Sequence, residues 1–278
     1  MKNVRYFSVL NLLALLAHIC FSYGTQLKLF NSSDVGEVSA RYESLFTPAG
    51  FTFSIWGLIY LALLIFCIYH IVAAYRSDLS HTANRDTLKI SGSFIANNLA
   101  AAAWLVAWTR EMIGLSVVLI FFQLLCLIII HTRLGIHNPA RGTASTLFTQ
   151  IPLSIYLGWI SIASIANVSA FLASIPWSGA GISYITWTVI MIVVAVLLTS
   201  IMVLARKNVA YGLVVIWALY GIIIKRQSVD AARYDHIIQA AWIGMAVVAL
   251  LCIVRFSMNL RIHTHRHAAF PLSPHSLK

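Results

Sequence analysis

Long apolar runs separated by short polar stretches dominate the chain. A helix needs about 20 mostly apolar residues to cross the hydrocarbon core of a bilayer. Eight segments of the 278-residue sequence meet this requirement. They run near residues 6–23, 51–74, 89–109, 112–131, 146–173, 182–205, 208–224 and 236–256. The pattern therefore predicts an all-α integral membrane protein with eight transmembrane helices.

The polar connections between these spans are short, with two exceptions. Residues 24–50 join the first two spans, and residues 75–88 join the second and third. Only Arg110 and Glu111 separate the third span from the fourth, so we expect a tight helical hairpin there. The seventh span, 208–224, is the shortest, and we expect it to tilt less than the others. No small-residue cleavage site follows the first span, which predicts an uncleaved helix rather than a signal peptide.

The composition supports the same class of protein. Only 10% of the residues are charged and 60% are hydrophobic, whereas a soluble domain has about 25% charged residues. So few charges could not cover a soluble globule, but the outside of a membrane protein is apolar. The formal charge of +11 is spread over short loops. We therefore predict the lipid bilayer as a partner and exclude nucleic acid.

The positive residues also predict an orientation. When the N-terminus is placed inside, most of the 19 Lys and Arg residues fall on inside segments, as membrane topology requires. An even number of spans then puts both termini in the cytoplasm of a multi-pass inner-membrane (cell-membrane) protein. The four cysteines lie in apolar runs without CxxC spacing, which is typical of free thiols; they are Cys20, Cys67, Cys126 and Cys252.

Ionisable groups at membrane depth are costly and usually mark function. No Asp, Glu, Lys or Arg lies in the middle of a predicted span, and His18, near the outer end of the first, fits an interfacial residue. No nucleophile with a base, acid–base pair or metal cluster is visible, so we predict no catalytic residue and no metal site. We expect no specific role for the histidines of the tail, which are His263, His265 and His267.

Aromatic and amide side chains instead occur inside three predicted helices. They form stripes at helical spacing: Trp56 and Tyr60; Asn97, Ala101, Trp104 and Trp108; and Pro152, Tyr156, Trp159, Ala163 and Asn167. Aromatic residues of membrane proteins usually lie at the two interfaces, which does not explain the central ones. Helix packing explains them, and so does a pocket for a flat apolar ligand with a few polar edges. Pro152 would add a kink that opens space.

At these stripes the sequence resembles the TspO/MBR family, the tryptophan-rich sensory proteins related to the translocator protein. Residues 47–60, TPAGFTFSIWGLIY, are similar to the Pro-rich entry to that family's second helix with its Trp and Tyr. Residues 151–167, IPLSIYLGWISIASIAN, keep the Tyr, Trp, Ala and Asn of its fifth helix in register. In the third helix Trp104 matches, but Ala101 stands where the family has Asn, and Asn97 lies one turn earlier.

The resemblance implies three parts. Residues 1–175 would form a five-helix TspO-like bundle, 176–258 a C-terminal extension of three membrane helices, and 259–278 a basic, His-rich cytoplasmic tail. It also implies a ligand pocket between the helices of the bundle, covered by residues 24–50. The implied pocket residues are Trp56, Tyr60, Asn97, Trp104, Tyr156, Trp159, Ala163 and Asn167, with Asn98 as a weaker candidate.

Three functions stay open at this point. The resemblance implies a membrane-embedded binding protein or sensor for a porphyrin, another tetrapyrrole or a sterol-like ligand, with no required cofactor beyond such a porphyrin or haem-type ligand. A facilitative transporter of a hydrophobic metabolite is the alternative, since no buried charge or inverted repeat supports coupled transport. A tetrapyrrole-modifying enzyme is disfavoured because no acid–base pair is visible. The small residues at 100–103 would suit the seam of a homodimer.

Overall fold

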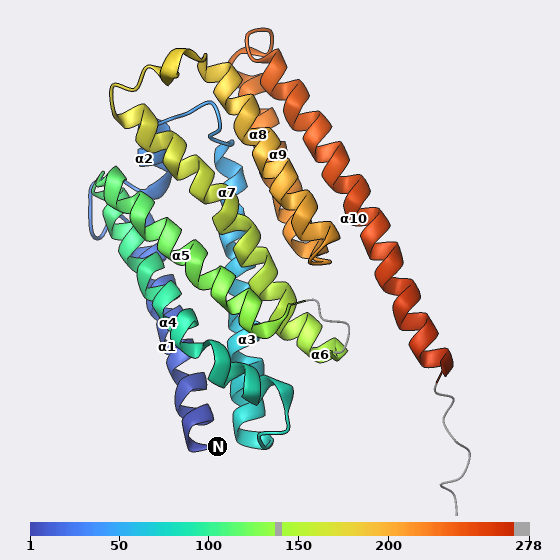
Figure 1. The fold of residues 1–278 in the computed structure, drawn as a ribbon. Coiled ribbons are helices and arrows are strands. Elements are labelled where there is room, and N and C mark those ends of the chain that lie inside the picture. The colour runs from blue at the N-terminus through green and yellow to red at the C-terminus, as the bar shows by residue number, and fades with distance from the viewer. Residues whose placement is uncertain (137–140, 270–278) are drawn as a thin grey trace, which may run out of the picture.

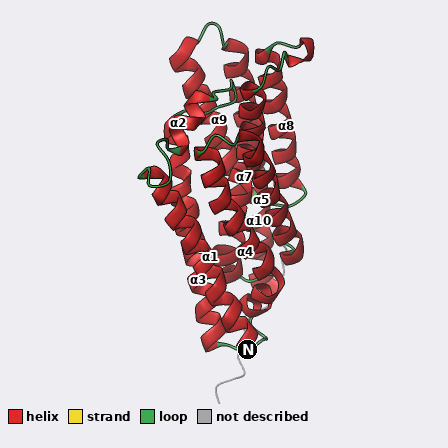
Figure 2. Cartoon of the chain, turned by 90° about the vertical axis from the view of Figure 1, so that its left-hand side faces the viewer, coloured by secondary structure: helices red, strands yellow, loops and turns green. Residues whose placement is uncertain are grey.

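A computed structural model describes residues 1–136 and 141–269, with side chains as far as residue 259. Every regular element in these ranges is helical (Figures 1 and 2). Eight of the helices are long and apolar enough to cross a membrane, which confirms the predicted class. They are α1 (Lys2–Gln26), α3 (Ile55–Arg76), α4 (Thr82–Thr109), α5 (Ile113–Leu134), α7 (Ile151–Ser174), α8 (Tyr184–Leu204), α9 (Val209–Asp230) and α10 (Asp235–Ala269).

Five short elements complete the fold. They are α2 (Val35–Arg41), the 3-10 turns η1 (Gly50–Ser54) and η3 (Gly179–Gly181), the single turn α6 (Thr143–Ser145) and the π-helical turn η2 (Thr146–Gln150). The outer surface of the long helices is apolar, with Leu58, Leu61 and Leu197 each more than half exposed. A hydrocarbon solvent removes the cost of that exposure, as expected for a membrane protein. The side chains of His263, His265 and His267 lie outside the described residues.

The first five long helices close into a ring in the order α1, α3, α7, α5 and α4, each contacting the next and α4 contacting α1. Apolar side chains from all five meet inside this ring, among them Leu15, Ile59, Phe94, Leu127 and Leu153. The remaining helices α8, α9 and α10 contact one another beside the ring (Figure 1). The helices are thus arranged as a group of five and a group of three.

Helix α9 joins the two groups by packing against α7. Gly158 of α7 makes this approach close, because a Cβ atom there would lie 3.1 Å from Cβ of Val214 and 3.2 Å from the carbonyl oxygen of Tyr211. Asn208, at the start of α9, donates a hydrogen bond of 3.0 Å to Oγ of Ser154 on α7. A small residue and a paired amide therefore set this interface.

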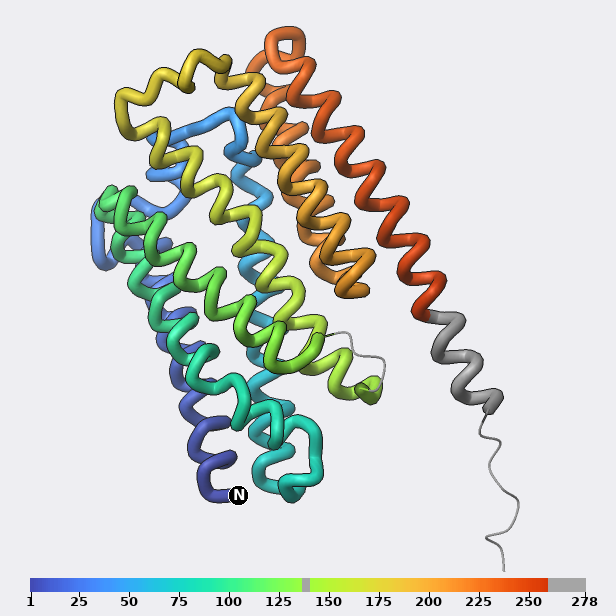
Figure 3. Tube along the Cα trace, viewed as in Figure 1, coloured from blue at the N-terminus to red at the C-terminus, as the bar shows by residue number. Residues whose placement is uncertain are grey.

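The segment between α1 and α3 lies at the end of the bundle opposite to the N-terminus (Figure 3). Its helix α2 begins with a capping box, in which Asp34 and Glu37 satisfy each other's backbone amides. Val35 and Val38 pack against α4, where the Trp108 indole donates to the carbonyl of Val35 over 3.1 Å. Hydrogen bonding and apolar contact thus hold this segment on the bundle.

The expected length of the seventh span needs correction. The seventh span is not short, because α9 continues through Asp230 and includes Lys225 and Arg226. This extension is stabilised by Glu43, which forms ion pairs with both residues. The fifth span contains the π-helical turn η2, which ends two residues before Pro152. A π turn is a common way to accommodate a proline, which cannot donate a backbone hydrogen bond.

The small residues at 100–103 pack within the chain. Ala100, Ala101 and Ala102 are buried and only Ala103 is exposed. Helix α4 has close contacts with both α1 and α5, so the alanines let three helices approach each other. The run therefore gives no free seam for a dimer, and the homodimer stays a prediction without this support.

Candidate functional site

The aromatic stripes of α3 and α7 meet inside the five-helix ring. Trp56 and Tyr60 stack on each other with ring centroids 5.4 Å apart. Trp56 also makes edge contacts with Tyr156 at 6.1 Å and with Trp159 at 6.3 Å. The i, i+4 and i, i+3 spacings put each pair on one helix face, and the packing of α3 against α7 brings the two faces together. We call these four residues the aromatic cluster.

His18 of α1 belongs to the same place. Its ring makes edge contacts with Trp56 and Tyr60, with centroids 5.8 and 5.3 Å away. The sequence fits His18 to an interfacial position; in the structure its side chain points into the bundle and is only 1% exposed. The Nδ1 atom lies 3.2 Å from Oδ1 of Asn98, so an amide from α4 compensates part of the cost of burying the imidazole. The sequence could not show this pairing between residues of different helices.

Asn97 of α4 also reaches the aromatic cluster, where it contacts Tyr156. Its amide nitrogen donates a 3.0 Å hydrogen bond to the hydroxyl of Tyr156, and the residue is fully buried. Asn97 and Asn98 thus point to different helices, one to α7 and the other to α1. The structure brings Trp56, Tyr60, Asn97, Tyr156 and Trp159 of the predicted set together.

Two more predicted residues form a separate contact closer to α2. The indole of Trp104 donates to Oδ1 of Asn167 over 2.7 Å, and Asn167 donates to Oγ of Ser116 on α5 over 2.8 Å. Trp104 also stacks on Trp108 at 5.4 Å. Ala163 lies between the two contacts along α7 and packs, partly buried, against the core. The pair Trp104–Asn167 therefore ties α4 to α7 and α5.

Two polar atoms near the aromatic cluster have no hydrogen-bond partner among the described residues. They are the indole nitrogen Nε1 of Trp159, a donor, and Oδ1 of Asn97, an acceptor, and both are buried. An unsatisfied polar group in a bilayer-spanning structure costs several kcal/mol. The aromatic cluster and the neighbouring Asn97 thus offer one unpaired donor and one unpaired acceptor, both buried.

A cavity lies against another face of α7, away from the aromatic cluster. It measures about 1110 Å³ and is bordered by α5, α7, α8 and the start of α9. Side chains such as Leu124, Ile165, Val168 and Met191 make most of its wall apolar. None of the eight predicted pocket residues is among the described residues that line it. We call this cavity the α7–α8 cleft.

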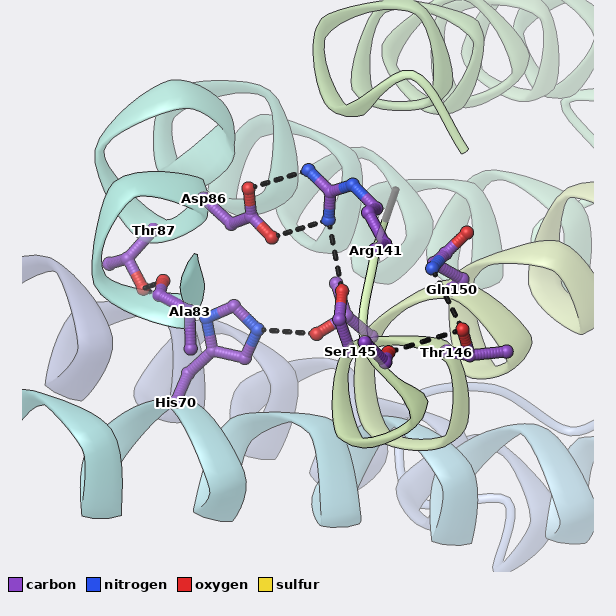
Figure 4. Close-up of polar contacts among 10 residues, drawn as sticks. His70, Ala83, Asp86, Thr87, Arg141, Ser145, Thr146 and Gln150 are labelled. Atoms are coloured by element: carbon purple, nitrogen blue, oxygen red, sulfur yellow. Dashed lines mark hydrogen bonds and ion pairs between the residues drawn. The ribbon is translucent and has the colours of Figure 1, made fainter. Parts of the chain in front are cut away.

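A polar network lies where the end of α3, the start of α4 and η2 meet (Figure 4). This end of the bundle is the one opposite to the segment between α1 and α3 (Figure 3). His70 is buried, with Nδ1 2.8 Å from Oγ1 of Thr87 and Nε2 3.0 Å from Oγ1 of Thr149 in the π turn. Arg141 forms a two-pronged ion pair with Asp86, with nitrogen–oxygen distances of 2.7 and 2.8 Å. A second cavity of about 840 Å³ opens beside this network.

The sequence did not reveal this network. Asp86 was assigned to a loop because the third span was expected to begin at residue 89, but α4 begins at Thr82. His70 lies inside an apolar run, whose periodicity does not indicate its partners. The pairing of Asp86 with Arg141 joins positions 55 residues apart, which no periodicity can show. The signals in the sequence were two polar residues next to apolar positions, His70 and Asp86.

Among the described residues, no group of three or more His, Cys, Asp or Glu side chains is placed to hold a metal ion. All four cysteines are free; three are buried, and Cys20 faces outward. The two ring nitrogens of His70 form hydrogen bonds with Thr87 and Thr149 of neighbouring helices.

Comparison with known proteins identifies the family of the chain. No curated protein and no solved structure matches the chain. The family described as TSPO-like protein matches residues 8–254, a range that includes the aromatic cluster, the α7–α8 cleft and parts of all eight long helices. Since the match extends over most of the sequence, the chain belongs to the TSPO-like protein family.

Proposed function

We propose that this protein is a membrane-embedded binding protein for a flat, apolar ligand with a few polar edges, of the porphyrin or sterol type. The observation that carries the proposal is the unpaired donor and acceptor at the aromatic cluster, Nε1 of Trp159 and Oδ1 of Asn97. A ligand with both an acceptor and a donor on its edge would pair with these atoms. Its apolar faces would replace contacts between the rings.

The ligand would enter by separating rings that now touch. Trp56 and Tyr60 are only partly buried, whereas Tyr156 and Trp159 are fully enclosed. We therefore expect the stacked pair on α3 to move while the α7 pair stays in place. Tyr156 is held by its hydrogen bond from Asn97, which supports a fixed wall on that side. Binding would then change the surroundings of Trp56 and its fluorescence.

The test is a titration of purified protein with protoporphyrin IX, followed by tryptophan fluorescence. Trp159→Phe keeps an aromatic ring but removes the free donor, and Asn97→Ala removes the free acceptor. We expect each change to weaken binding about fivefold to tenfold, as loss of a hydrogen bond worth ~1 kcal/mol predicts. Trp242→Phe is the control, because Trp242 lies on the outward surface of α10.

Unchanged affinity in both Trp159→Phe and Asn97→Ala would refute the location. Binding that is lost only when the α7–α8 cleft is filled, for example by Ser169→Trp, would move the site to that cleft. Porphyrin flux into proteoliposomes separates binding from facilitated transport, since a binding protein would show saturable binding without flux. Loss of porphyrin absorbance in light, dependent on Trp56 or Trp159, would instead favour an enzyme.

A further inference from the structure

The α7–α8 cleft runs along most of the length of α8. One face of α8 lines it at helical spacing, from Tyr184 through Thr188, Met191, Ala195 and Leu198 to Met202. At 1.5 Å per residue this stripe is about 27 Å long, close to the ~30 Å thickness of a hydrocarbon core. Exposed side chains form its rim, including Phe121, Ile128 and Ile201. The cleft is therefore open sideways to the bilayer along its length.

Hydroxyl groups in the helical walls of the cleft are already hydrogen-bonded within their own helices. Ser161, Ser164 and Ser169 of α7 each donate to the carbonyl four residues earlier, over 2.7 to 2.9 Å. Thr188 of α8 does the same over 2.8 Å. These hydroxyls keep no free donor for an occupant, so the wall acts as an apolar surface. An extended hydrocarbon chain matches such a wall better than a ligand with polar edges.

Aromatic side chains gather at one end of the cleft. Trp177 and Trp187 contact each other with centroids 5.5 Å apart, and Tyr184 donates to the carbonyl of Trp177 over 2.8 Å. Tyr234 closes the same end from the loop before α10. Trp and Tyr collect at the level of lipid headgroups in membrane proteins. This aromatic end therefore marks the depth at which a headgroup would sit.

Two charged side chains line the cleft at that end, Glu43 and Arg233. Glu43 is already paired with Arg226 at 2.5 Å and with Lys225 at 3.2 Å. Asp230 accepts the backbone N–H of Arg233 at 3.0 Å. The Arg233 guanidinium lies over the ring of Tyr234, is exposed, and has no ion-pair partner among the described residues. Arg233 lines the cleft and is free to meet a phosphate.

We propose that the α7–α8 cleft binds an anionic phospholipid, with an acyl chain along α8 and the phosphate at Arg233. This site is distinct from the aromatic cluster and takes a different kind of ligand. The three C-terminal helices would thus create a lipid site that a five-helix bundle alone lacks, since α8 supplies one wall and Arg233 the charged end.

The test uses the full-length protein in detergent and native mass spectrometry with added phosphatidylglycerol or phosphatidylcholine. We expect the wild type to keep one phosphatidylglycerol at energies that strip phosphatidylcholine. Ser169→Trp, which fills the cleft from a partly exposed position, should lower this retention about tenfold. Ala103→Trp is the matched control, because it adds the same ring to an exposed small residue on α4.

A second pair of variants tests the charged end. Arg233→Gln should remove the preference for phosphatidylglycerol, whereas Arg110→Gln, an exposed arginine of the α4–α5 hairpin, should leave it unchanged. Equal retention in the wild type, Ser169→Trp and Ala103→Trp would overturn the proposal. It would also be overturned if Ser169→Trp removed bound porphyrin or a dimer while the lipid adduct stayed the same. Failure of the porphyrin test at Trp159 alone would leave the lipid site standing.

Discussion

At the scale of residues, polar side chains inside the bundle come in pairs drawn from different helices. Asn11 donates to Ser91, Asn97 to Tyr156 and Trp104 to Asn167, over 2.7 to 3.0 Å. The sequence singled out Asn97, Trp104 and Asn167 as aromatic and amide residues at helical spacing, and it left both helix packing and a ligand pocket open as their role. It could not predict their partners, which lie 59 and 63 positions away for Asn97 and Trp104.

The ion pair between Asp86 and Arg141 gives a prediction at this scale. Its side chains are 2% and 12% exposed, so removal of one partner leaves a nearly buried charge. Asp86→Leu should destabilise the protein by about 3 kcal/mol, measured as a lower melting temperature in detergent. The double variant Asp86→Leu with Arg141→Leu should be more stable than Asp86→Leu alone.

Asp235→Asn is the control for that experiment, because Asp235 is an exposed carboxylate that accepts a hydrogen bond from the nearby Gln239. Its melting temperature should stay within the range of ordinary surface changes, about 0.5 kcal/mol. If Asp86→Leu melts like Asp235→Asn, the pair contributes no stability to the folded protein.

At the scale of elements, the segment before α3 connects the two groups of helices. The backbone carbonyl of Thr52 accepts a 3.0 Å hydrogen bond from the Trp217 indole. The backbone N–H of Ala49 donates to the carbonyl of Gly221 over 3.0 Å. Arg226, although only 2% exposed, is neutralised by Glu43 of the same segment. Helicity and apolar faces were predictable from periodicity, but this attachment joins positions 165 and 183 residues apart.

The Glu43–Arg226 contact predicts a pH dependence. Burial raises the pKa of Glu43, but hydrogen bonds from Arg226 and Lys225 and their charges outweigh it and hold that pKa below its ordinary value of 4.5. The stability that Glu43 supplies is therefore complete above about pH 4.5 and is lost as pH falls through the lower, folded pKa. Glu43→Gln should lower the melting temperature at pH 7, by about 2 kcal/mol of stability.

As the pH is lowered toward about 3, the melting temperatures of the wild type and Glu43→Gln should converge. Lys28→Gln is the control, because the Lys28–Glu37 pair is exposed and such pairs contribute about 0–1 kcal/mol. A difference between the wild type and Glu43→Gln that stays constant from pH 7 to pH 3 would show that the carboxylate charge is not the cause.

At the scale of the whole molecule, the eight spans form a group of five and a group of three. Helix α9 of the second group packs against α7 of the first. The chain begins at the end of the bundle that carries the His70–Asp86 network, opposite to the segment between α1 and α3 (Figure 3). Lys and Arg favour the first of these ends as the cytoplasmic one.

Cysteine labelling tests this orientation. Lys28→Cys should react with a membrane-impermeant maleimide in intact cells, because Lys28 lies in the exposed segment after α1. Ser80→Cys, in the exposed turn before α4, should react only after the membrane is opened. The unmodified chain is the control for its own cysteines, which lie in membrane helices. The reverse pattern of labelling would place the N-terminus outside.

The sequence alone determined the membrane environment, the eight helices and the faces that bear Trp56, Tyr60, Tyr156 and Trp159. These follow from hydrophobic length and from a helical period of 3.6 residues, which are local properties. Only the tertiary structure decided that His18 joins those rings, that Asp86 meets Arg141 and that α7 and α8 enclose a cleft. Such features depend on which helices become neighbours, and apolar surfaces that all suit a bilayer equally well do not encode that choice in any local pattern.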